Sequence, residues 1–89
     1  MRIIRRTNQF KKDYKLAIKR GKEIKKLDNL IIKLAKGEKL EEKLRDHMLL
    51  GKYQNRRECH IEGDWLLIYK IEKNEIVFER TGSHSNLFE

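Results

Sequence analysis

The spacing of apolar residues changes along this chain, from a helical repeat in the first half to a strand-like repeat in the last third. In residues 10–36 the apolar positions recur every three or four residues, and each of two such stretches ends at a glycine. In residues 55–81 they alternate or run on without a break, as they do in strands. The pattern therefore predicts two helices followed by a small sheet.

The first predicted helix follows a short strand over residues 2–6. Thr7 or Asn8 can cap this helix, because a short polar side chain accepts from the free N–H groups of the first turn. Gly21 ends it, since glycine tolerates the left-handed conformation found after a helix. Four apolar residues share one face of this helix: Phe10, Tyr14, Ala17 and Ile18.

The second predicted helix runs from Glu23 to Lys36, and Gly37 ends it. The short link around Gly21 implies that the two helices form an antiparallel hairpin. The apolar stripe of the second helix consists of Ile24, Leu27, Leu30, Ile31 and Leu34.

Three strands are predicted after a polar loop over residues 38–54, which holds one helical turn near residues 40–44. The strands cover residues 55–61, 65–71 and 75–81, and the tail after them has room for a short helical turn. The middle strand is apolar almost throughout, as a strand buried on both sides would be. In the strand over residues 55–61, side chains alternate between the two faces. Arg57, Cys59 and Ile61 lie on one face, and Arg56, Glu58 and His60 lie on the other.

The predicted element order is β-α-α-β-β-β, within a single domain over residues 1–89. We expect an α+β fold in which the helical hairpin packs on one face of a small, mostly antiparallel sheet. The other face of the sheet would be open, and it is the natural place for a site.

Positive charge is concentrated in the predicted helical half. The chain carries a net charge of +8. Residues 1–43 hold 15 Lys/Arg and 6 Asp/Glu, a net of +9, whereas residues 44–89 hold 7 and 8, a net of −1. Such a surface favours a polyanionic partner such as nucleic acid, an acidic protein or an anionic membrane.

A cytoplasmic setting is expected from the cysteine count and from the lack of targeting signals. The single cysteine, Cys59, cannot form an internal disulfide, which fits a reducing compartment. No apolar run approaches the ~18 residues of a membrane span, and the first residues lack the apolar core of a signal peptide. We therefore expect no membrane association.

The three histidines, His47, His60 and His84, all lie outside the basic helices, and Asp64 follows His60 by four residues. RNA cleavage by the 2′-hydroxyl needs a base, an acid and positive charge at the phosphate, and histidines with basic residues can supply all three without a metal. The basic candidates for substrate binding are Lys52, Arg56, Arg57 and Arg80.

A metal site is the competing interpretation of the same residues. Cys59 and His60 are adjacent in a predicted strand, so their side chains point to opposite faces. No CxxC, HExxH or paired-carboxylate spacing is present, and there is no glycine-rich phosphate loop. We therefore expect neither a metal nor another cofactor.

A spaced motif covers the second half of the chain: DH at 46–47, LGK at 50–52, RECHI at 57–61, DWLLIY at 64–69, RTGSH at 80–84 and LF at 87–88. With the lysine-rich helical hairpin before it, the whole chain resembles the YafQ branch of the RelE/ParE toxin superfamily. The resemblance implies a toxin of a bacterial type II toxin–antitoxin pair. It also implies an endoribonuclease that cuts mRNA in the ribosomal A site without a metal.

The resemblance carries specific residues with it. It implies an active centre of His47, His60, Asp64, His84 and Phe88, with Arg80 at a phosphate-contacting position. We expect His60 with Asp64 to form one acid–base unit and His84 to be its counterpart. His47 would position the substrate or share proton transfer, and Phe88 would pack against a base or ribose. Glu58 stands where some relatives have Asp.

The resemblance also implies partners: a cognate antitoxin, the ribosome with its mRNA, and operator DNA reached through the antitoxin complex. Two other functions stay open at this point. A ParE-like toxin would bind DNA gyrase without cutting nucleic acid. A basic nucleic-acid-binding domain would rely on charge alone and would bind with a steep salt dependence.

Overall fold

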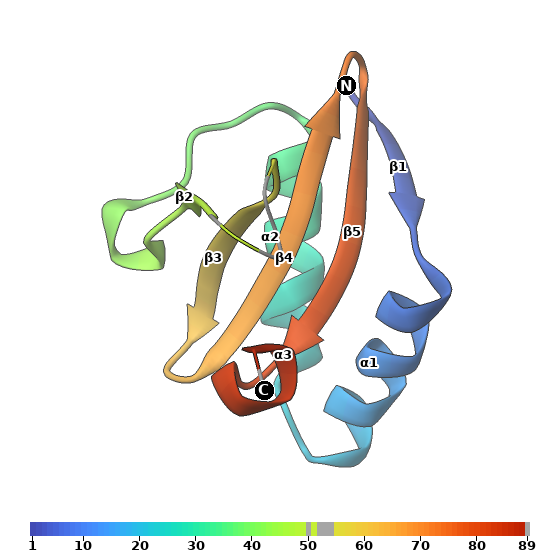
Figure 1. The fold of residues 1–89 in the computed structure, drawn as a ribbon, viewed down its shortest axis with the longest axis vertical. Helices are drawn as coiled ribbons and strands as arrows, with labels where there is room; N and C mark the ends of the chain where they lie inside the picture. Colours follow the sequence, from blue (N-terminus) through green and yellow to red (C-terminus); the bar gives the residue numbers. More distant parts are fainter. Residues whose placement is uncertain (50, 52–54, 89) are drawn as a thin grey trace.

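The fold is built on one five-stranded sheet, which Figure 1 shows with its helices. The computed structural model describes residues 1–49, 51 and 55–88. Along the chain the elements are β1 (Ile3–Arg6), α1 (Asn8–Lys19), α2 (Ile24–Ala35), the 3₁₀ turn η1 (Glu42–Leu44), β2 (His47–Met48), β3 (Arg57–Glu62), β4 (Trp65–Glu72), β5 (Glu75–Gly82) and α3 (His84–Phe88).

The strands lie in the order β1-β5-β4-β3-β2. Each neighbouring pair is antiparallel except β1 and β5, which run parallel. A parallel pair cannot be joined by a tight turn, so the chain between β1 and the meander has to leave the sheet and return. The two N-terminal helices make that excursion, and the expected mostly antiparallel α+β fold is confirmed.

The residues that the sequence predicts at the helix ends do cap and end the helices. Thr7 Oγ1 accepts from the backbone N–H of Phe10 at 3.0 Å, which satisfies a free donor in the first turn of α1. Gly21 and Gly37 follow α1 and α2 at φ of +78° and +80°, in the left-handed region that glycine enters without strain. The predicted helix boundaries are therefore confirmed to within about two residues.

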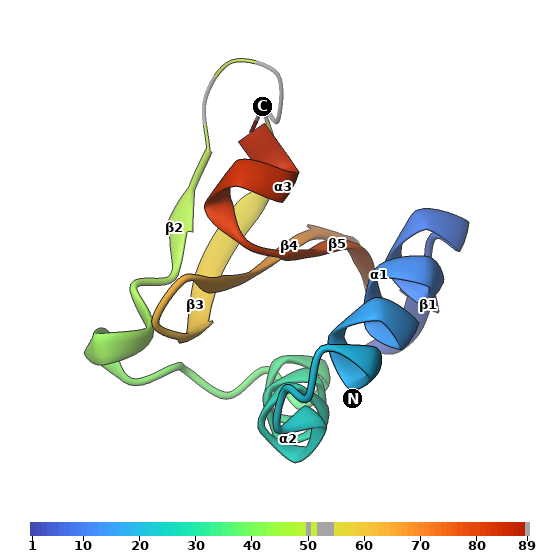
Figure 2. The same cartoon turned by 90° about the horizontal axis from the view of Figure 1, so that it is seen from below.

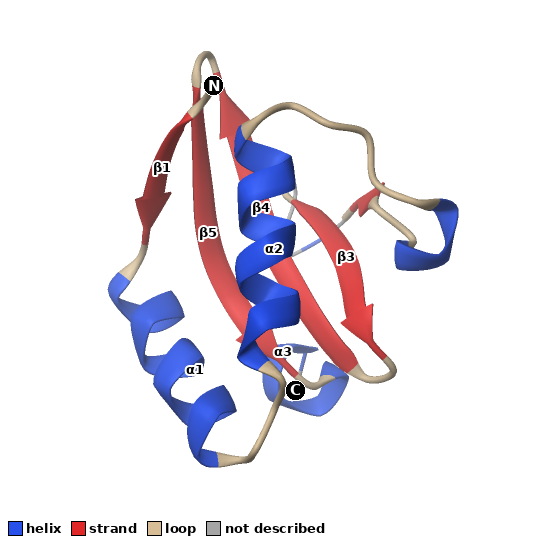
Figure 3. Cartoon of the chain, turned by 180° about the vertical axis from the view of Figure 1, so that it is seen from behind, coloured by secondary structure: helices blue, strands red, loops and turns tan. Residues whose placement is uncertain are grey.

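Both N-terminal helices lie on the same side of the sheet. Figure 3 shows α2 crossing the sheet, and Figure 2 shows α3 on the side opposite to α1 and α2. The main core fills the space between these helices and the sheet, where Leu27, Trp65 and Phe78 are almost fully buried. No helix among the described residues is long and apolar enough to span a membrane.

The structure corrects the sequence-based picture in three places. Residues 47–48, predicted as loop, form the edge strand β2. Ile18, predicted on the buried face of α1, is 52% exposed, and Asp13 is buried in that helix instead. The face expected to be open is partly covered, because Leu87 of α3 packs in a second apolar cluster with Leu66 and Ile68.

Candidate active site

The sheet register places His47, Glu58 and Arg80 in one row, with Ile68 between the last two. His47 pairs with Glu58, Glu58 with Ile68, and Ile68 with Arg80, so the row crosses β2, β3, β4 and β5. Residues directly opposite each other in a sheet point to the same side. Ile68 belongs to the apolar cluster under α3, so this is the face away from α1 and α2.

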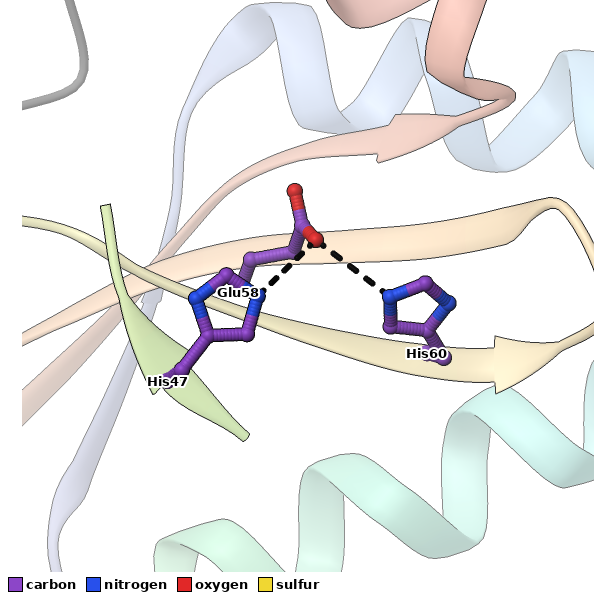
Figure 4. A group of neighbouring side chains, drawn as sticks. All are labelled: His47, Glu58 and His60. Carbon is purple, nitrogen blue, oxygen red and sulfur yellow. Dashed lines mark ion pairs between the residues drawn. The ribbon is translucent and has the colours of Figure 1, made fainter. Parts of the chain in front are cut away.

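Glu58 lies between two imidazole rings on this face. Its Oε1 atom is 3.3 Å from His47 Nε2 and 3.4 Å from His60 Nε2, as Figure 4 shows. The Glu58 side chain is 6% exposed, whereas those of His47 and His60 are 51% and 27% exposed. A carboxylate buried to this extent needs hydrogen-bonding or charged partners. We refer to His47, Glu58 and His60 as the His–Glu–His cluster.

The backbone of β2 fixes the orientation of the His47 ring. His47 Nδ1 lies 3.1 Å from the carbonyl oxygen of Met48, and a carbonyl only accepts, so Nδ1 carries the hydrogen. The other ring nitrogen, Nε2, therefore turns toward Glu58. A hydrogen bond of this kind holds a histidine in one tautomer, as catalytic and metal-binding histidines require.

Asp46 anchors the strand that carries His47. Its Oδ1 atom accepts from the Tyr69 hydroxyl at 2.6 Å and from Arg57 Nε at 3.0 Å. Tyr69 belongs to the main core under α1 and α2, so this contact ties β2 to the helix-covered side of the sheet. Burial, and next to it the hydrogen bond to Asp46, raises the pKa of Tyr69 above its ordinary value.

Asp64 holds the start of α3. Its Oδ1 atom accepts from the backbone N–H of His84 at 2.9 Å. The expected acid–base unit of His60 with Asp64 is therefore not the arrangement of these residues: the carboxylate beside the His60 ring is that of Glu58. The exposed His84 ring lies against the ring of Phe88, with 4.7 Å between the centroids, and Phe88 is 36% exposed.

The predicted basic residues have different environments. Arg80 donates from Nε to Asp13 Oδ2 at 2.8 Å, and Arg56 donates from Nε to Glu79 Oε2 at 3.0 Å. Arg57 is turned toward Asp46, away from the His–Glu–His cluster. Lys52, the fourth predicted residue, lies outside the described residues.

Asp13 is the buried acid of the lysine-rich helix α1. Besides the bond from Arg80 Nε, its carboxylate accepts from the backbone N–H of Thr81 at 3.2 Å and from the Gln9 side chain at 3.1 Å. Thr81 in turn donates to the carbonyl of Leu66 and accepts from the Trp65 indole. Asp13 thus fixes both Arg80 and the end of β5 that leads to His84.

Cys59 faces the other way from its neighbours in β3. It is fully buried in the main core, and burial raises the pKa of its thiol well above the ordinary value. A neutral, buried thiol is neither a nucleophile nor a metal ligand. Among the described residues, the group whose donor atoms could hold a metal ion is the His–Glu–His cluster, with these atoms within 4.8 Å of one another.

Three acids that organise this site are not among the residues that the sequence predicts for it: Asp13, Asp46 and Glu58. The signal for Glu58 was present, because strand alternation placed it on the face of His60. Asp13 also had a signal, since it sits at helical spacing from Phe10 and Ala17 on the buried side of α1. Asp46 stood in the DH motif beside His47, but its contacts could not be predicted, because its partners Arg57 and Tyr69 are distant in sequence.

Known proteins resemble this chain over its whole length. The family model described as the bacterial toxin of type II toxin–antitoxin systems, YafQ, matches residues 2–89. The mRNA interferase toxin YafQ of Escherichia coli strain K12 is 42% identical over 88 residues, covering 98% of this chain and 96% of that protein.

Solved structures agree with this match. YafQ from the E. coli strain BL21(DE3) superposes with a TM-score of 0.95 at 40% identity, and the match covers all of both chains. In the E. coli DinJ–YafQ complex, the matched chain has a TM-score of 0.93 at 41% identity, again over both full chains. A copper-bound mutant toxin from Helicobacter pylori has a TM-score of 0.94 at 36% identity, covering 99% of this chain and all of the other.

Proposed function

This chain belongs to the YafQ family of bacterial toxins of type II toxin–antitoxin systems, and we propose that it is an endoribonuclease that cuts mRNA on the ribosome. The observation that carries this proposal is the buried carboxylate of Glu58 between two imidazoles on the face away from α1 and α2. The 89 residues act as one toxin domain. A gyrase-binding function is not favoured, because the curated relative is an mRNA interferase and because a binder needs no proton-transfer groups.

The proposed reaction is attack of a ribose 2′-hydroxyl on the neighbouring phosphate. The 2′ oxygen forms a bond to phosphorus while the bond from phosphorus to the 5′ oxygen breaks, which leaves a 2′,3′-cyclic phosphate and a 5′-hydroxyl. The His–Glu–His cluster accepts the 2′ proton, and His84 donates a proton to the leaving 5′ oxygen. General acid–base catalysis of this kind contributes roughly 10²–10⁴-fold in rate.

The remaining candidate residues bind the substrate in this proposal. Arg80, held by Asp13, stabilises the additional negative charge on the phosphate in the transition state, and Arg56 with Lys52 binds flanking phosphates. Phe88 is exposed beside His84 and stacks on a base of the mRNA. Asp64 acts through His84, by holding the start of α3 in place.

We propose that the reaction needs no metal. Two proton-transfer centres and the arginines supply everything that a 2′-hydroxyl attack requires. The charge that a metal ion would contribute at the phosphate is available from Arg80. The H. pylori relative solved with copper bound shows that a metal can bind to a protein of this fold, which does not make the metal part of the chemistry.

The partners follow from the family and from the charge distribution. The E. coli relative is solved in complex with DinJ, and we propose that a cognate antitoxin binds this chain through its basic helical half. Lys11, Lys15 and Lys19 are exposed on α1. Reversing these three charges to Glu should weaken antitoxin binding in a titration. Unchanged affinity would exclude this use of the charge.

The same proposal places the toxin in the cytoplasm with the ribosome and its mRNA, and on operator DNA when it is bound to the antitoxin. An α+β domain with extents of 33 × 29 × 28 Å is small enough to enter a ribosomal site. Because binding would depend on contacts with RNA phosphates, affinity for ribosomes should fall steeply as the salt concentration rises.

The experiment that tests the proposed function measures mRNA cleavage by single variants, with and without programmed ribosomes. We expect His60→Ala and His84→Ala each to reduce the cleavage rate by at least about 100-fold. Ser85→Ala is the matched control, because Ser85 is exposed on α3 next to His84. If both histidine variants cut at the wild-type rate, the catalytic assignment is wrong. Equal cleavage without ribosomes would overturn the ribosome dependence.

A further inference from the structure

Helix α3 is too short to keep its shape without support from its surroundings. It spans five residues, and isolated helices of fewer than about 12 residues are marginal in water. It nevertheless carries His84 and Phe88, whose exposed rings lie against each other. The position of these two side chains therefore depends on the contacts that hold α3.

Ser83 and Asn86 close the first turn of α3 on each other. The Asn86 backbone N–H donates to Ser83 Oγ at 3.2 Å, and the Ser83 hydroxyl donates to Asn86 Oδ1 at 2.8 Å. The Ser83 backbone N–H donates to the same Asn86 Oδ1 atom at 3.4 Å. This reciprocal pattern is a capping box, with Asn in the place of the usual Glu or Gln. The box shapes the first turn, but it does not attach α3 to another element.

Arg20 supplies such an attachment from the lysine-rich half of the chain. It is the C-cap residue of α1, and its Nη1 atom donates to Asn86 Oδ1 at 3.1 Å. A groove of about 480 Å³ lies between α1 and α3, and both Arg20 and Asn86 line it. Because α1 and α3 lie on opposite sides of the sheet (Figure 2), this bond joins the two sides. We refer to Arg20, Ser83 and Asn86 as the α3 clamp.

The backbone that carries Arg20 is fixed on both sides. The Arg20 N–H donates to the Leu16 carbonyl at 2.9 Å, as the last turn of α1 requires. Two residues further on, the Lys22 ammonium lies 5.9 Å from the centroid of the Trp65 ring, within the range of a cation–π contact. Trp65 is almost fully buried at the start of β4. The Arg20 guanidinium therefore reaches α3 from a well-defined position.

The sheet holds α3 from other directions. Asp64, in the turn before β4, accepts from the backbone N–H of His84 at 2.9 Å, and Leu87 is buried in the apolar cluster under α3. A Cβ atom at Gly82 would lie 3.4 Å from Asn86 Cβ, so glycine allows α3 to lie close against the end of β5. With the clamp, α3 is held from the turn, from the sheet and from α1.

We propose that Arg20 and Asn86 are positioning residues for RNA cleavage, which hold α3 so that His84 stays within reach of the leaving 5′ oxygen. A general acid has to lie about 2.6–3.2 Å from the atom that receives its proton, so small movements of α3 reduce the rate. The catalytic consequence rests on the proposed function, whereas the clamp does not.

The clamp should act on the local position of α3 rather than on the stability of the whole domain. Arg20 and Asn86 are both exposed, so their hydrogen bonds compete with water and add little to the free energy of unfolding. A short terminal helix can open while the core stays folded. Variants of the clamp should therefore keep the urea unfolding midpoint of the wild type.

The clamp is tested by amide hydrogen exchange, without RNA or ribosomes. The Leu87 N–H donates to the Ser83 carbonyl at 3.1 Å within α3, so its exchange rate reports the opening of this helix. We expect Asn86→Ala to raise this rate by at least about 5-fold, the effect of losing a helix cap, although Ala favours helices more than Asn does. Arg20→Ala should raise it by about 3-fold, the contribution of one hydrogen bond. If either variant exchanges at the wild-type rate, the clamp is wrong.

Two matched controls keep the clamp intact. Ser85→Ala changes an exposed residue of α3, and Lys12→Ala removes an exposed charge from α1. Both should leave the exchange rate of the Leu87 amide at the wild-type value. If the controls raise it as much as the clamp variants do, any change on these helices loosens α3, and the specific role of Arg20 and Asn86 is wrong.

The catalytic consequence is tested by the kinetics of mRNA cleavage on programmed ribosomes. We expect kcat to fall roughly 10-fold in Asn86→Ala and about 3-fold in Arg20→Ala, with KM unchanged in both. The double variant should be no slower than Asn86→Ala, because Arg20 acts through Asn86. Asn86→Asp keeps an acceptor oxygen for Ser83 and Arg20, so it should restore most of kcat.

The other outcomes overturn the positioning role. If the two effects multiply in the double variant, or if Arg20→Ala raises KM instead, Arg20 binds RNA or the ribosome directly. If exchange of the Leu87 amide rises while kcat stays at the wild-type value, the position of α3 does not limit cleavage. If the wild type does not cut mRNA, the positioning role falls with the proposed function, and hydrogen exchange alone decides the clamp.

Discussion

Strand β3 carries a buried side chain on each of its two faces, but burial has a different chemical effect on each. Cys59 and Glu58 are adjacent, and their residues are 0% and 4% exposed. Cys59 faces α2 and the apolar core, where burial keeps its thiol neutral. Glu58 faces two imidazoles, where burial places a carboxylate against groups that exchange protons. The alternation of one strand thus separates the side that stabilises the domain from the side that carries chemistry.

The two faces are connected by a few polar contacts. Asp46 joins the strand of His47 to Tyr69 in the main core, and Asp13 joins α1 to Arg80. The site is therefore positioned from the helix-covered side, although the cluster itself lies on the other. Variants on each side should have separable effects on stability and on activity, and the following predictions test this from the largest expected effect to the smallest.

The largest effect is expected for Glu58→Gln, on the face of β3 that carries the His–Glu–His cluster. This change keeps the shape of the side chain but removes the charge between the two rings, so the rate of mRNA cleavage should fall by at least about 100-fold. The unfolding midpoint in urea should move little. Glu62→Gln is the matched control, because it is the same change on the same strand at an exposed position. A Glu58→Gln protein with wild-type activity would show that the cluster is not catalytic.

On the helix-covered face we expect the opposite result for Leu67→Ala. Leu67 is fully buried in the main core, so truncation should reduce the free energy of unfolding by about 2–5 kcal/mol. Cleavage per folded molecule should stay at the wild-type value. Urea unfolding and ribosome assays below the transition measure the two effects. Ile71→Ala changes a residue that is on the same strand but 41% exposed, so it should reduce the free energy of unfolding far less. A catalytic defect in folded Leu67→Ala would break the separation of the two faces.

Asp13→Asn tests the connection between the faces. The variant keeps the shape of the side chain but weakens a charge-assisted hydrogen bond to Arg80, so cleavage should fall roughly 10-fold, equivalent to about 1.4 kcal/mol. If Asp13 acts through Arg80, the double variant with Arg80→Lys should be less defective than the product of the two single effects. Fully multiplicative effects would indicate that Asp13 only stabilises the fold.

The smallest effect concerns the pH dependence contributed by Cys59. Burial raises the pKa of this thiol in the folded protein, so it stays protonated while the unfolded chain releases its proton at alkaline pH. The stabilising contribution is complete below the pKa of the unfolded thiol and is lost as the pH rises above it, a loss on the order of 1 kcal/mol by pH 10. Urea unfolding between pH 7 and pH 10 should show this loss in the wild type. In Cys59→Ala the decline should be smaller by that amount. An identical decline in both proteins would contradict the assignment.

The sequence predicted the elements well where a local rule decided them. The helices end at Gly21 and Gly37 because of backbone conformations that the chain specifies within a few residues. The first and last strands of the meander were predicted from period-2 alternation, the middle strand from its nearly unbroken apolar run, and α3 from the short tail. The edge strand β2 was missed because two residues carry no periodicity; Glu58 and Arg57 across the sheet define it as a strand.

The sequence predicted which types of residue form the site, but only partly which carboxylate lies beside which histidine. Strand alternation placed Glu58 and His60 on one face, yet proximity in sequence favoured Asp64 as the partner of His60. In the structure, a change of register between His60 and Glu62 lies between His60 and the turn that carries Asp64. Asp64 reaches His84 instead, 20 residues further along the chain. Ile18 was misplaced because its i+8 spacing from Phe10 put it on the apolar face, whereas in the structure Asp13, which packs against β5, takes a buried position of α1 instead.

The most direct test of the central claim is the chemistry of the RNA ends after cleavage on programmed ribosomes. If the 2′-hydroxyl is the nucleophile, the upstream fragment should end in a 2′,3′-cyclic phosphate and the downstream fragment should begin with a 5′-hydroxyl, both measurable by mass spectrometry. An mRNA with one 2′-deoxynucleotide at the scissile position should not be cut there. Fragments with 5′-phosphate ends, or normal cutting of the deoxy substrate, would mean that water attacks and would contradict the account.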